Sequence, residues 1–463
     1  MSRLLIQADL TWLDGSFSPG TTVAVGVSGR VESVGSAHHS GSGAFRRLEG
    51  MALLPGFVNA HSHAFQRGLR GSVERFSGGT GTFWSWRDGM YALAASLDRE
   101  TFGQLCRRAF AEMRSVGITC VGEFHYLHHD GDHDWAFDDV VLEAAAEVGI
   151  RLVLLQTSYT TGGIGCPLEP GQHRFDTVDL AAYWRQWDRL ARQLDPRTQS
   201  LGVVAHSVRA SRLSEIQALH GEAVRRRLPF HIHVEEQRKE IEEAMAAYGR
   251  TPMRVLCEEL QSAEGITAVH CTHTSPEDMT VFLQGGGRVC VCPLTEGNLG
   301  DGIPDLTAPH SVGGRLALGS DANTRISPIE EMRWLEYGQR LRAERRGALA
   351  DPRGGVAACV LEAATCGGAT ALGVGSGRIA PGEWADFVAI KLGSVPLAGE
   401  PSEASPPPWP ACNRTTTLRR SASRMSNVSK SANMGSPGQP GSLAAGGTWV
   451  NPPRATSRPR RCP

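Results

Sequence analysis

Eight short apolar segments alternate with longer amphipathic segments in the central part of the chain, and this alternation limits the possible folds most strongly. Apolar segments of this length are typical of buried strands, and the segments between them have helical periodicity. Because strands separated by helices pair in parallel, the pattern predicts an α/β fold with a (β/α)8 barrel. The predicted strands are residues 53–58, 117–122, 150–156, 201–205, 229–234, 266–271, 288–292 and 315–319.

A doubly wound open sheet is the structural alternative, because it also alternates strands and helices. That fold is expected to carry a glycine-rich turn after its first strand. Here the first predicted strand is followed by His61-Ser62-His63, which favours the barrel. The predicted helices are residues 98–115, 135–148, 177–193, 212–226 and 276–284.

Polar side chains fall at or just after the carboxyl ends of many predicted strands. In a barrel these ends meet on one face, where active sites lie. One histidine at such a place is usually structural, but the convergence of several predicts a functional site. The residues are His61, His63, Glu123, His125, Tyr126, His206, His231, His233, His270 and Asp321.

The pair His61 and His63 predicts a metal site. Side chains alternate along a strand, so both imidazoles lie on one face and can hold a divalent ion. His233 and Asp321 can complete the site from other strands and leave one position open for water. Nitrogen and oxygen ligands in an open site are typical of Zn²⁺, and Fe²⁺ is compatible with them.

Glu236 and His270 are the predicted catalytic partners of this site, together with Asp321. Glu236 follows His233 by three residues, so its carboxylate can reach a water in the open position and carry a proton to a leaving group. His270 can orient that water or a developing oxyanion. Asp321 can accept a hydrogen bond from the water.

Four segments, PGFVNAHSH, HIHVEEQ, VHCTH and LGSDAN, resemble in this order the amidohydrolase superfamily. The resemblance implies a (β/α)8 barrel with a small β-sandwich made from both chain ends. Binuclear members bridge two metals with a carbamylated lysine after strand four. The lysine within the barrel here is Lys239, after strand five, so the chain resembles the mononuclear deaminases.

Longer segments resemble the formimidoylglutamate deiminases of histidine degradation over about residues 50–390. They are HSHAFQRGLRG, FWSWRDGMY, GEFHYLHHD, LTEGNLGDGI and SPIEEMRWLEYGQRL. The resemblance implies a homodimer that hydrolyses N-formimidoyl-L-glutamate, a small dicarboxylate, to N-formyl-L-glutamate and ammonia. The residues matching substrate-binding positions are Gln66, Arg87, Tyr126, His206 and Arg209.

Two other functions stay open. Another mononuclear deaminase, acting on guanine, cytosine or an adenosine derivative, would need a pocket suited to a flat ring. The paired guanidinium groups of Arg87 and Arg209 favour carboxylates instead. The second alternative is a folded metal-binding barrel that is inactive because of its aberrant carboxyl-terminal part.

The net charge of −1 combines two unlike parts of the chain. Residues 401–463 carry nine basic side chains and one acidic one, Glu403, so the remainder is clearly acidic. An acidic main body argues against nucleic acid as a partner. No segment has the roughly 18 consecutive apolar residues of a membrane helix. Asp9 interrupts any export signal near the amino terminus, so we expect a cytoplasmic protein.

Composition changes sharply near residue 394, where proline, serine and arginine become dominant and periodicity ends. This composition predicts a disordered tail. An out-of-frame translation of GC-rich DNA is our preferred explanation for it. We therefore expect residues 1–50 to be the first part of the small sandwich, 51–370 the barrel, 371–393 an incomplete second part of the sandwich, and 394–463 the tail.

Overall fold

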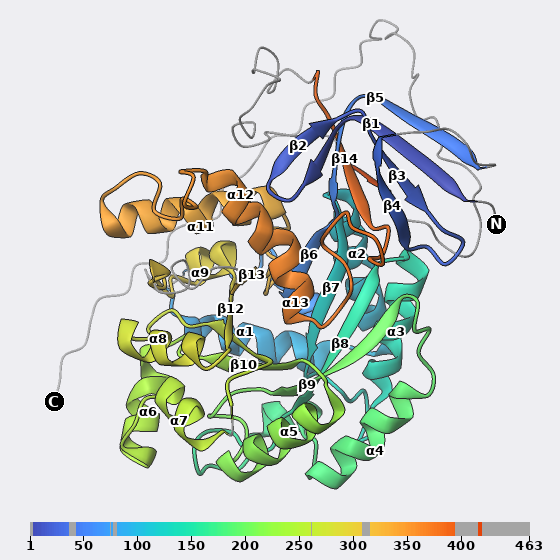
Figure 1. Ribbon diagram of the computed structural model, residues 1–463. Coiled ribbons are helices and arrows are strands. Elements are labelled where there is room, and N and C mark those ends of the chain that lie inside the picture. The colour runs from blue at the N-terminus through green and yellow to red at the C-terminus, as the bar shows by residue number, and fades with distance from the viewer. Residues whose placement is uncertain are drawn as a thin grey trace, which may run out of the picture. The chain divides into compact units, whose positions relative to one another are not determined.

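The computed structural model of the chain describes residues 3–36, 43–74, 76, 81–260, 262–307, 315–393 and 415–418. Eight parallel strands form a barrel-like sheet, and a smaller sheet lies beside it (Figure 1). None of the described helices has both the length and the apolar character required to cross a membrane.

The strands of the barrel are neighbours in chain order, and the pairings between them are parallel. This order confirms the predicted (β/α)8 architecture. The strands are β6 (Phe57–Ser62), β7 (Ile118–His125), β8 (Arg151–Ser158), β9 (Gln199–Ala205), β10 (Phe230–Val234), β11 (Ile266–His270), β12 (Arg288–Val291) and β13 (Leu316–Leu318).

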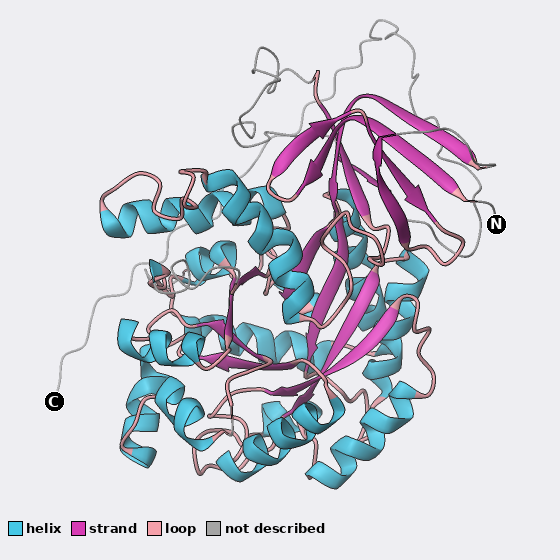
Figure 2. Cartoon of the chain, viewed as in Figure 1, coloured by secondary structure: helices cyan, strands magenta, loops and turns pink. Residues whose placement is uncertain are grey.

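Helices surround this sheet on its outer side (Figure 2). Several begin within one residue of the predicted start, and Asp98 and Ser275 each accept a hydrogen bond from a backbone N–H of the first turn. Helix α4 begins at Leu180, three residues after its predicted start at residue 177, because Asp179 is the residue that caps it. The α-helices are α1 (Phe83–Ser96), α2 (Arg99–Ser115), α3 (Ala136–Val148), α4 (Leu180–Ala191), α5 (Leu213–Arg226), α6 (Arg238–Tyr248), α7 (Pro252–Glu259), α8 (Pro276–Gln284), α9 (Pro293–Leu299), α11 (Pro328–Ala343), α12 (Val356–Glu362) and α13 (Gly368–Ala371). Shorter helical segments are η1 (Ala64–Leu69), η2 (Pro170–Phe175) and η3 (Ala363–Gly367).

The first predicted strand, 53–58, is wrong in its boundaries. Leu53 and Leu54 end a strand of the small sheet, β5 (Ala44–Pro55), and the barrel strand β6 begins at Phe57. Both leucines are buried, as are the first residues of β6. Two strands of different sheets therefore follow each other with the same apolar character, and apolarity alone could not separate them.

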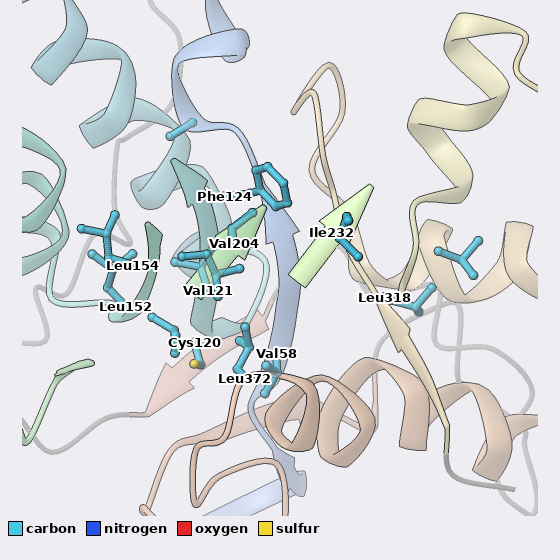
Figure 3. Packing of buried hydrophobic residues seen from close by; sticks show 14 of the residues in the cluster. Val58, Cys120, Val121, Phe124, Leu152, Leu154, Val204, Ile232, Leu318 and Leu372 are labelled. Atoms are coloured by element: carbon cyan, nitrogen blue, oxygen red, sulfur yellow. The ribbon is translucent and has the colours of Figure 1, made fainter. Parts of the chain in front are cut away.

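Apolar side chains from strands on several sides of the barrel fill its core (Figure 3). Val58, Val121, Leu154 and Ile232 belong to this cluster and are almost completely buried. Leu372, directly after α13, packs close to Gly122 of β7, where a Cβ would approach the leucine side chain to 2.4 Å. The segment after α13 therefore contributes to the same core.

The barrel closes between β6 and the residues directly after β13. The backbone N–H groups of Ser320 and Asp321 donate to the carbonyl of His61, each at 3.0 Å, and the N–H of His63 donates to the carbonyl of Asp321 at 3.0 Å. Asp321 has a φ of 46°, in the left-handed region that aspartate adopts more readily than most residues other than glycine. Asn323 supports the closure by donating from its side chain to the His63 carbonyl at 3.0 Å.

The small sheet combines strands from both parts of the chain, in the order β15-β14-β5-β1-β3-β4, with β2 paired to β1. Its own buried cluster includes Ile6, Val23, Leu53 and Phe387. The remaining strands are β1 (Leu4–Leu13), β2 (Ser16–Pro19), β3 (Thr21–Val25), β4 (Val31–Ser36), β14 (Phe387–Lys391) and β15 (Thr415–Leu418).

Strand β15 lies within the range for which the sequence predicts a disordered tail. It pairs antiparallel with β14, from Thr415 opposite Ile390 to Leu418 opposite Phe387. These four residues therefore form a strand, and the predicted disorder does not hold for them. The rest of the predicted tail, residues 394–414 and 419–463, lies outside the described residues.

A buried ion pair connects the barrel to the segment that enters β14. The guanidinium of Arg151 on β8 donates from Nε to Oδ2 of Asp386 at 2.8 Å, and both side chains are at most 6% exposed. We expect Arg151→Ala to lower the free energy of unfolding by about 3–5 kcal/mol, because Asp386 would lose the cation it faces in the interior. Urea unfolding monitored by circular dichroism measures this loss.

The exposed pair between Arg99 and Glu143, 3.9 Å apart, supplies the control. Arg99→Ala should change the unfolding midpoint little, since surface pairs contribute little to stability. Equal midpoints for the two variants would contradict the importance assigned to the Arg151 pair.

Candidate metal centre and active-site pocket

Four predicted metal ligands converge at the carboxyl end of the barrel. His61 and His63 project from β6 and the turn after it, His233 from β10, and Asp321 follows β13. One ligand atom from each lies within 4.8 Å of the others. Oδ1 of Asp321 is 3.2 Å from Nε2 of His61 and 3.3 Å from Nε2 of His63, and all four residues are buried.

Hydrogen bonds orient two of the imidazoles for ligation. Nδ1 of His63 lies 2.8 Å from the Phe124 carbonyl, and Nδ1 of His233 lies 3.1 Å from the His206 carbonyl. A carbonyl only accepts, so each Nδ1 carries the proton and each Nε2 presents a lone pair to the centre. Nδ1 of buried His61 has no hydrogen-bond partner among the described residues. Three imidazole nitrogens and a carboxylate fit one divalent ion.

Burial keeps these histidines neutral. It lowers the pKa of His61 to about 3 and that of His63 to about 4, and it places the pKa of His233 well below its usual value. The Asp321 carboxyl behaves in the opposite way. Burial opposes its ionisation, but its hydrogen bond to His61 and the nearby histidines hold its pKa below the usual range. Near neutral pH the set therefore has the protonation states that metal ligands need.

Glu236 and His270 lie beside this centre, as the sequence predicts for its catalytic partners. Nε2 of His270 is 3.8 Å from Oε1 of Glu236 and 3.9 Å from Oδ2 of Asp321. Burial raises the pKa of the Glu236 carboxyl, which is suitable for a group that accepts and returns a proton. For His270, burial is outweighed by the carboxylates of Glu236, Glu296 and Asp321, which raise its pKa.

Glu296 is a site residue that sequence reasoning missed. Its Oε1 lies 3.3 Å from Nδ1 of His270 and accepts the backbone N–H of Cys292 at 2.9 Å, so it orients the imidazole. Glu296 lies within LTEGNLGDGI, one of the segments noted in the sequence. The segment was noted for its resemblance, but no local pattern pairs this carboxylate with a histidine on β11.

A pocket opens next to the metal centre and has a volume of about 250 Å³. Ten of the eleven predicted site residues line it, and His61 lies beneath its wall. The ten are His63, Gln66, Arg87, Tyr126, His206, Arg209, His233, Glu236, His270 and Asp321. Trp84, Trp86, Tyr91, Tyr159 and Lys239 are further parts of its wall.

The cationic side chains of the pocket differ in their partners. Arg209 has Nε 3.7 Å from Oε2 of Glu240, a carboxylate that is completely buried. Burial raises the pKa of Glu240 to about 7, although Arg209 acts in the opposite direction. The guanidinium of Arg87 lies over Trp84, 4.6 Å from the ring centroid, and has no ion-pair partner among the described residues. The pocket therefore offers positive charge to a ligand.

Gln66 and Tyr126 form a polar pair in the same pocket. Nε2 of Gln66 donates to the Tyr126 hydroxyl at 2.8 Å, and both residues are buried. The ring of Tyr126 is 5.0 Å from that of His63 and 5.3 Å from that of His206. These side chains thus place hydrogen-bonding groups beside the metal ligand His63, in the pocket that the arginines also line.

Three other histidines, on the barrel strands or just after them, have structural partners instead. His231 on β10 lies with Nε2 2.8 Å from the Ala371 carbonyl. His125 and His128 contact Oδ1 of Asp138 at 2.8 and 2.9 Å. These are hydrogen-bond distances, and none of these residues lines the pocket. The histidines therefore support the barrel and its loops.

Comparisons with known proteins agree with this geometry. The family model described as the amidohydrolase family matches residues 52–433. Formimidoylglutamate deiminase from Pseudomonas aeruginosa is 38% identical over 362 residues, which cover 77% of this chain and 80% of that protein. 5-Methylthioadenosine/S-adenosylhomocysteine deaminase from Syntrophomonas wolfei is 29% identical over 355 residues, or 74% of each protein.

Solved structures share the fold. An amidohydrolase from Brucella melitensis has a TM-score of 0.78 and 32% identity, covering 86% of this chain and 88% of that one. An adenosine deaminase from Xanthomonas campestris with bound zinc has a TM-score of 0.72 at 24% identity, covering 86% of each chain. Because the adenosine deaminase is only 24% identical, its similarity to this chain shows the fold alone.

The convergence of four ligands predicts metal binding that depends on Asp321. We expect the purified chain to retain about one divalent ion after dialysis, because three neutral imidazoles and a carboxylate surround one point. Asp321→Asn should weaken retention at least about tenfold, since it removes the anionic ligand. Elemental analysis during titration with a chelator measures the difference.

His133→Ala is a matched control, because the His133 side chain is 40% exposed and does not line the pocket. It should keep its metal, and circular dichroism should show that both variants are folded. Equal metal retention by the Asp321 variant and the control would exclude the proposed ligand set.

Proposed function

The chain belongs to the amidohydrolase family, and from this membership we propose that it deiminates N-formimidoyl-L-glutamate, giving N-formyl-L-glutamate and ammonia. The observation that carries the proposal is a metal-ligand set that shares a pocket with Arg87 and Arg209. The substrate carries two carboxylates, and guanidinium groups are suited to bind carboxylates. The similarity to a formimidoylglutamate deiminase supports the same assignment.

The finer assignments follow from this activity. His61, His63, His233 and Asp321 would hold one divalent ion, for which Zn²⁺ is the proposed identity and Fe²⁺ is also compatible. When bound, the ion would lower the pKa of a coordinated water toward about 7 and so supply a nucleophile at neutral pH. We further propose a role in histidine degradation in the cytoplasm and a homodimeric state.

Glu236 is the proposed proton carrier. Its carboxylate accepts a proton from the attacking water as the oxygen adds to the formimidoyl carbon. Glu236 then returns this proton to the terminal nitrogen of the tetrahedral intermediate formed from the protonated amidine. The carbon–nitrogen bond breaks and ammonia leaves, while the hydroxyl group of the intermediate loses its remaining proton and becomes the formyl carbonyl. His270, oriented by Glu296, is close enough to Glu236 and Asp321 to stabilise charge on the oxygen during these steps.

Gln66, Tyr126 and His206 are the proposed polar contacts of the substrate, and Arg87 and Arg209 the proposed carboxylate ligands. The half-buried Arg87 faces no carboxylate in the described part of the chain, and this leaves its guanidinium available to a ligand. A flat, neutral ring in the pocket would leave the Arg87 guanidinium without an anionic partner. Because a charge without a partner in a pocket costs free energy, the ring deaminases are the weaker alternative.

An assay for ammonia release separates these functions. We expect the metal-loaded chain to release ammonia from N-formimidoyl-L-glutamate with a kcat/KM at least about 10³-fold above that for guanine or 5-methylthioadenosine, because neither carries a carboxylate for the arginines. A higher kcat/KM for either ring compound would assign the chain to another deaminase. If none of the three compounds releases ammonia, the chain would be assigned to the alternative of an inactive metal-binding barrel.

Glu236→Gln tests the proton carrier. The amide cannot accept and return the proton, so turnover should fall about 10²–10⁴-fold while the metal content stays unchanged. Glu242→Gln, at an exposed position on α6, is the control and should behave like the wild type. Near-normal turnover of the Glu236 variant would remove this residue from the mechanism.

A further inference from the structure

A second cluster of side chains that can bind a metal lies around the other ring nitrogen of His270. One ligand atom from each of His270, Cys292 and Glu296 lies within 4.8 Å of the others, and all three residues are buried. His270 ends β11, Cys292 directly follows β12, and Glu296 lies in α9. Nε2 of His270 faces Asp321 at 3.9 Å, whereas its Nδ1 faces Glu296. The same imidazole therefore borders the first centre and belongs to the second cluster.

The spacing of the atoms in this cluster is that of metal ligands. Nδ1 of His270 lies 3.3 Å from Oε1 of Glu296. A charge-assisted hydrogen bond between such groups is usually about 2.7–2.9 Å long. Two ligands that lie about 2.0–2.1 Å from one zinc ion in tetrahedral geometry are about 3.3 Å apart. The observed distance therefore fits two ligands of one ion better than a strong hydrogen bond.

The first metal centre has the same spacing. Oδ1 of Asp321 lies 3.2 Å from Nε2 of His61 and 3.3 Å from Nε2 of His63. Nε2 of His61 lies 3.2 Å from Nε2 of His233. The separation between His270 and Glu296 is thus the separation found within the ligand set that the family similarity supports.

A third histidine–carboxylate cluster in the described ranges has a different geometry. His125 and His128 approach Oδ1 of Asp138 to 2.8 and 2.9 Å. Gln156 and Gln186 donate to its Oδ2 at 2.9 and 2.6 Å. These are hydrogen-bond distances, and four donors use the acceptor positions of the carboxylate. That cluster therefore leaves no carboxylate oxygen for an ion, in contrast to the one at His270.

The backbone holds two ligands of the second cluster in place. The N–H of Cys292 donates to Oε1 of Glu296 at 2.9 Å, and the N–H of Glu296 donates to the Cys292 carbonyl at 2.9 Å. The cysteine and the carboxylate are consequently fixed relative to each other before an ion binds. Such preorganisation of the ligands favours binding.

The ligand atoms determine which ions this cluster would bind. They are an imidazole nitrogen, a carboxylate oxygen and a sulfur. Sulfur favours ions such as Zn²⁺, Co²⁺ and Cd²⁺ over Mg²⁺ and Ca²⁺, which prefer oxygen ligands. The ion would replace the Nδ1 proton of His270 and the thiol proton of Cys292, and both protons would pass to the solvent.

We propose that His270, Cys292 and Glu296 form a second metal site for a thiophilic divalent ion, and that an ion bound there inhibits the chain. With the ion on Nδ1, the ring cannot carry protons on both nitrogens, and its bond to the metal fixes it beside Cys292. His270 could then no longer act as the cation that stabilises charge on the reacting oxygen. The site itself is independent of the proposed deimination, and only its inhibitory effect rests on that function.

A titration with Co²⁺ tests the site directly. The chain is first loaded with about one equivalent of Zn²⁺, which is colourless, and Co²⁺ is then added. We expect the added ion to produce the near-ultraviolet absorption of sulfur-to-cobalt charge transfer, because the ligands of the first centre include no sulfur. Cys292→Ser should lose this absorption and keep its zinc.

Cys106→Ser is the matched control, because Cys106 on α2 is equally buried and belongs to none of the three clusters. It should keep the absorption, and circular dichroism should show that both variants are folded. If Cys292→Ser does not fold, Glu296→Gln replaces it and should bind Co²⁺ about tenfold more weakly. Absence of the absorption in the wild type, its persistence in Cys292→Ser, or unchanged binding by Glu296→Gln would overturn the site.

Ammonia release from N-formimidoyl-L-glutamate measures the inhibitory effect. Excess Zn²⁺ should lower kcat of the wild type at least about tenfold, since a positioned acid or base contributes about 10²–10⁴-fold. Cys292→Ser should need at least about tenfold more Zn²⁺ for the same loss, and Cys106→Ser should match the wild type. If the absorption appears while kcat is unchanged by excess Zn²⁺, the inhibitory role is wrong. If no ammonia is released at any zinc concentration, the proposed function fails, and the Co²⁺ titration alone decides the site.

Discussion

The closure of the barrel at His61 and Asp321 is the constraint on which the rest of the site depends. The backbone hydrogen bonds that join the first and last strands are made by the residues whose side chains converge as metal ligands. Asp321 is held in a left-handed conformation there, and Asn323 secures the neighbouring backbone. The geometry of the metal centre and the integrity of the barrel are therefore coupled, because a shift in one displaces the other.

Burial produces the second property of the site. It keeps the ligand histidines neutral and raises the pKa of Glu236, and these effects suit metal binding and proton transfer. The same exclusion of water strengthens the attraction between the pocket arginines and an anionic ligand. One physical cause, the burial of side chains at the carboxyl end of the barrel, thus acts on both the reacting groups and the groups that hold the substrate.

The sequence predicts the parts of this structure that depend on local pattern. Apolar periodicity indicates the barrel strands, and the spacing of His61 and His63 indicates a metal site before any geometry is known. The boundary between β5 and β6 was missed, because Leu53 and Leu54 before it and Phe57 and Val58 after it are all buried. Glu296 and Glu240 were also missed. Their roles arise from contacts between distant segments, which no spacing along the chain reveals.

The central claim is that one metal centre and a pocket for two carboxylates act together on a linear amidine. It is tested most directly by comparing kcat/KM of the zinc-loaded chain for N-formimidoyl-L-glutamate with that for its diamide, in which both carboxylates are replaced by neutral carboxamides. The account predicts a preference of at least about 10⁴-fold for the dicarboxylate, since two charge-assisted contacts are lost in the diamide. Equal values for the two compounds would contradict it.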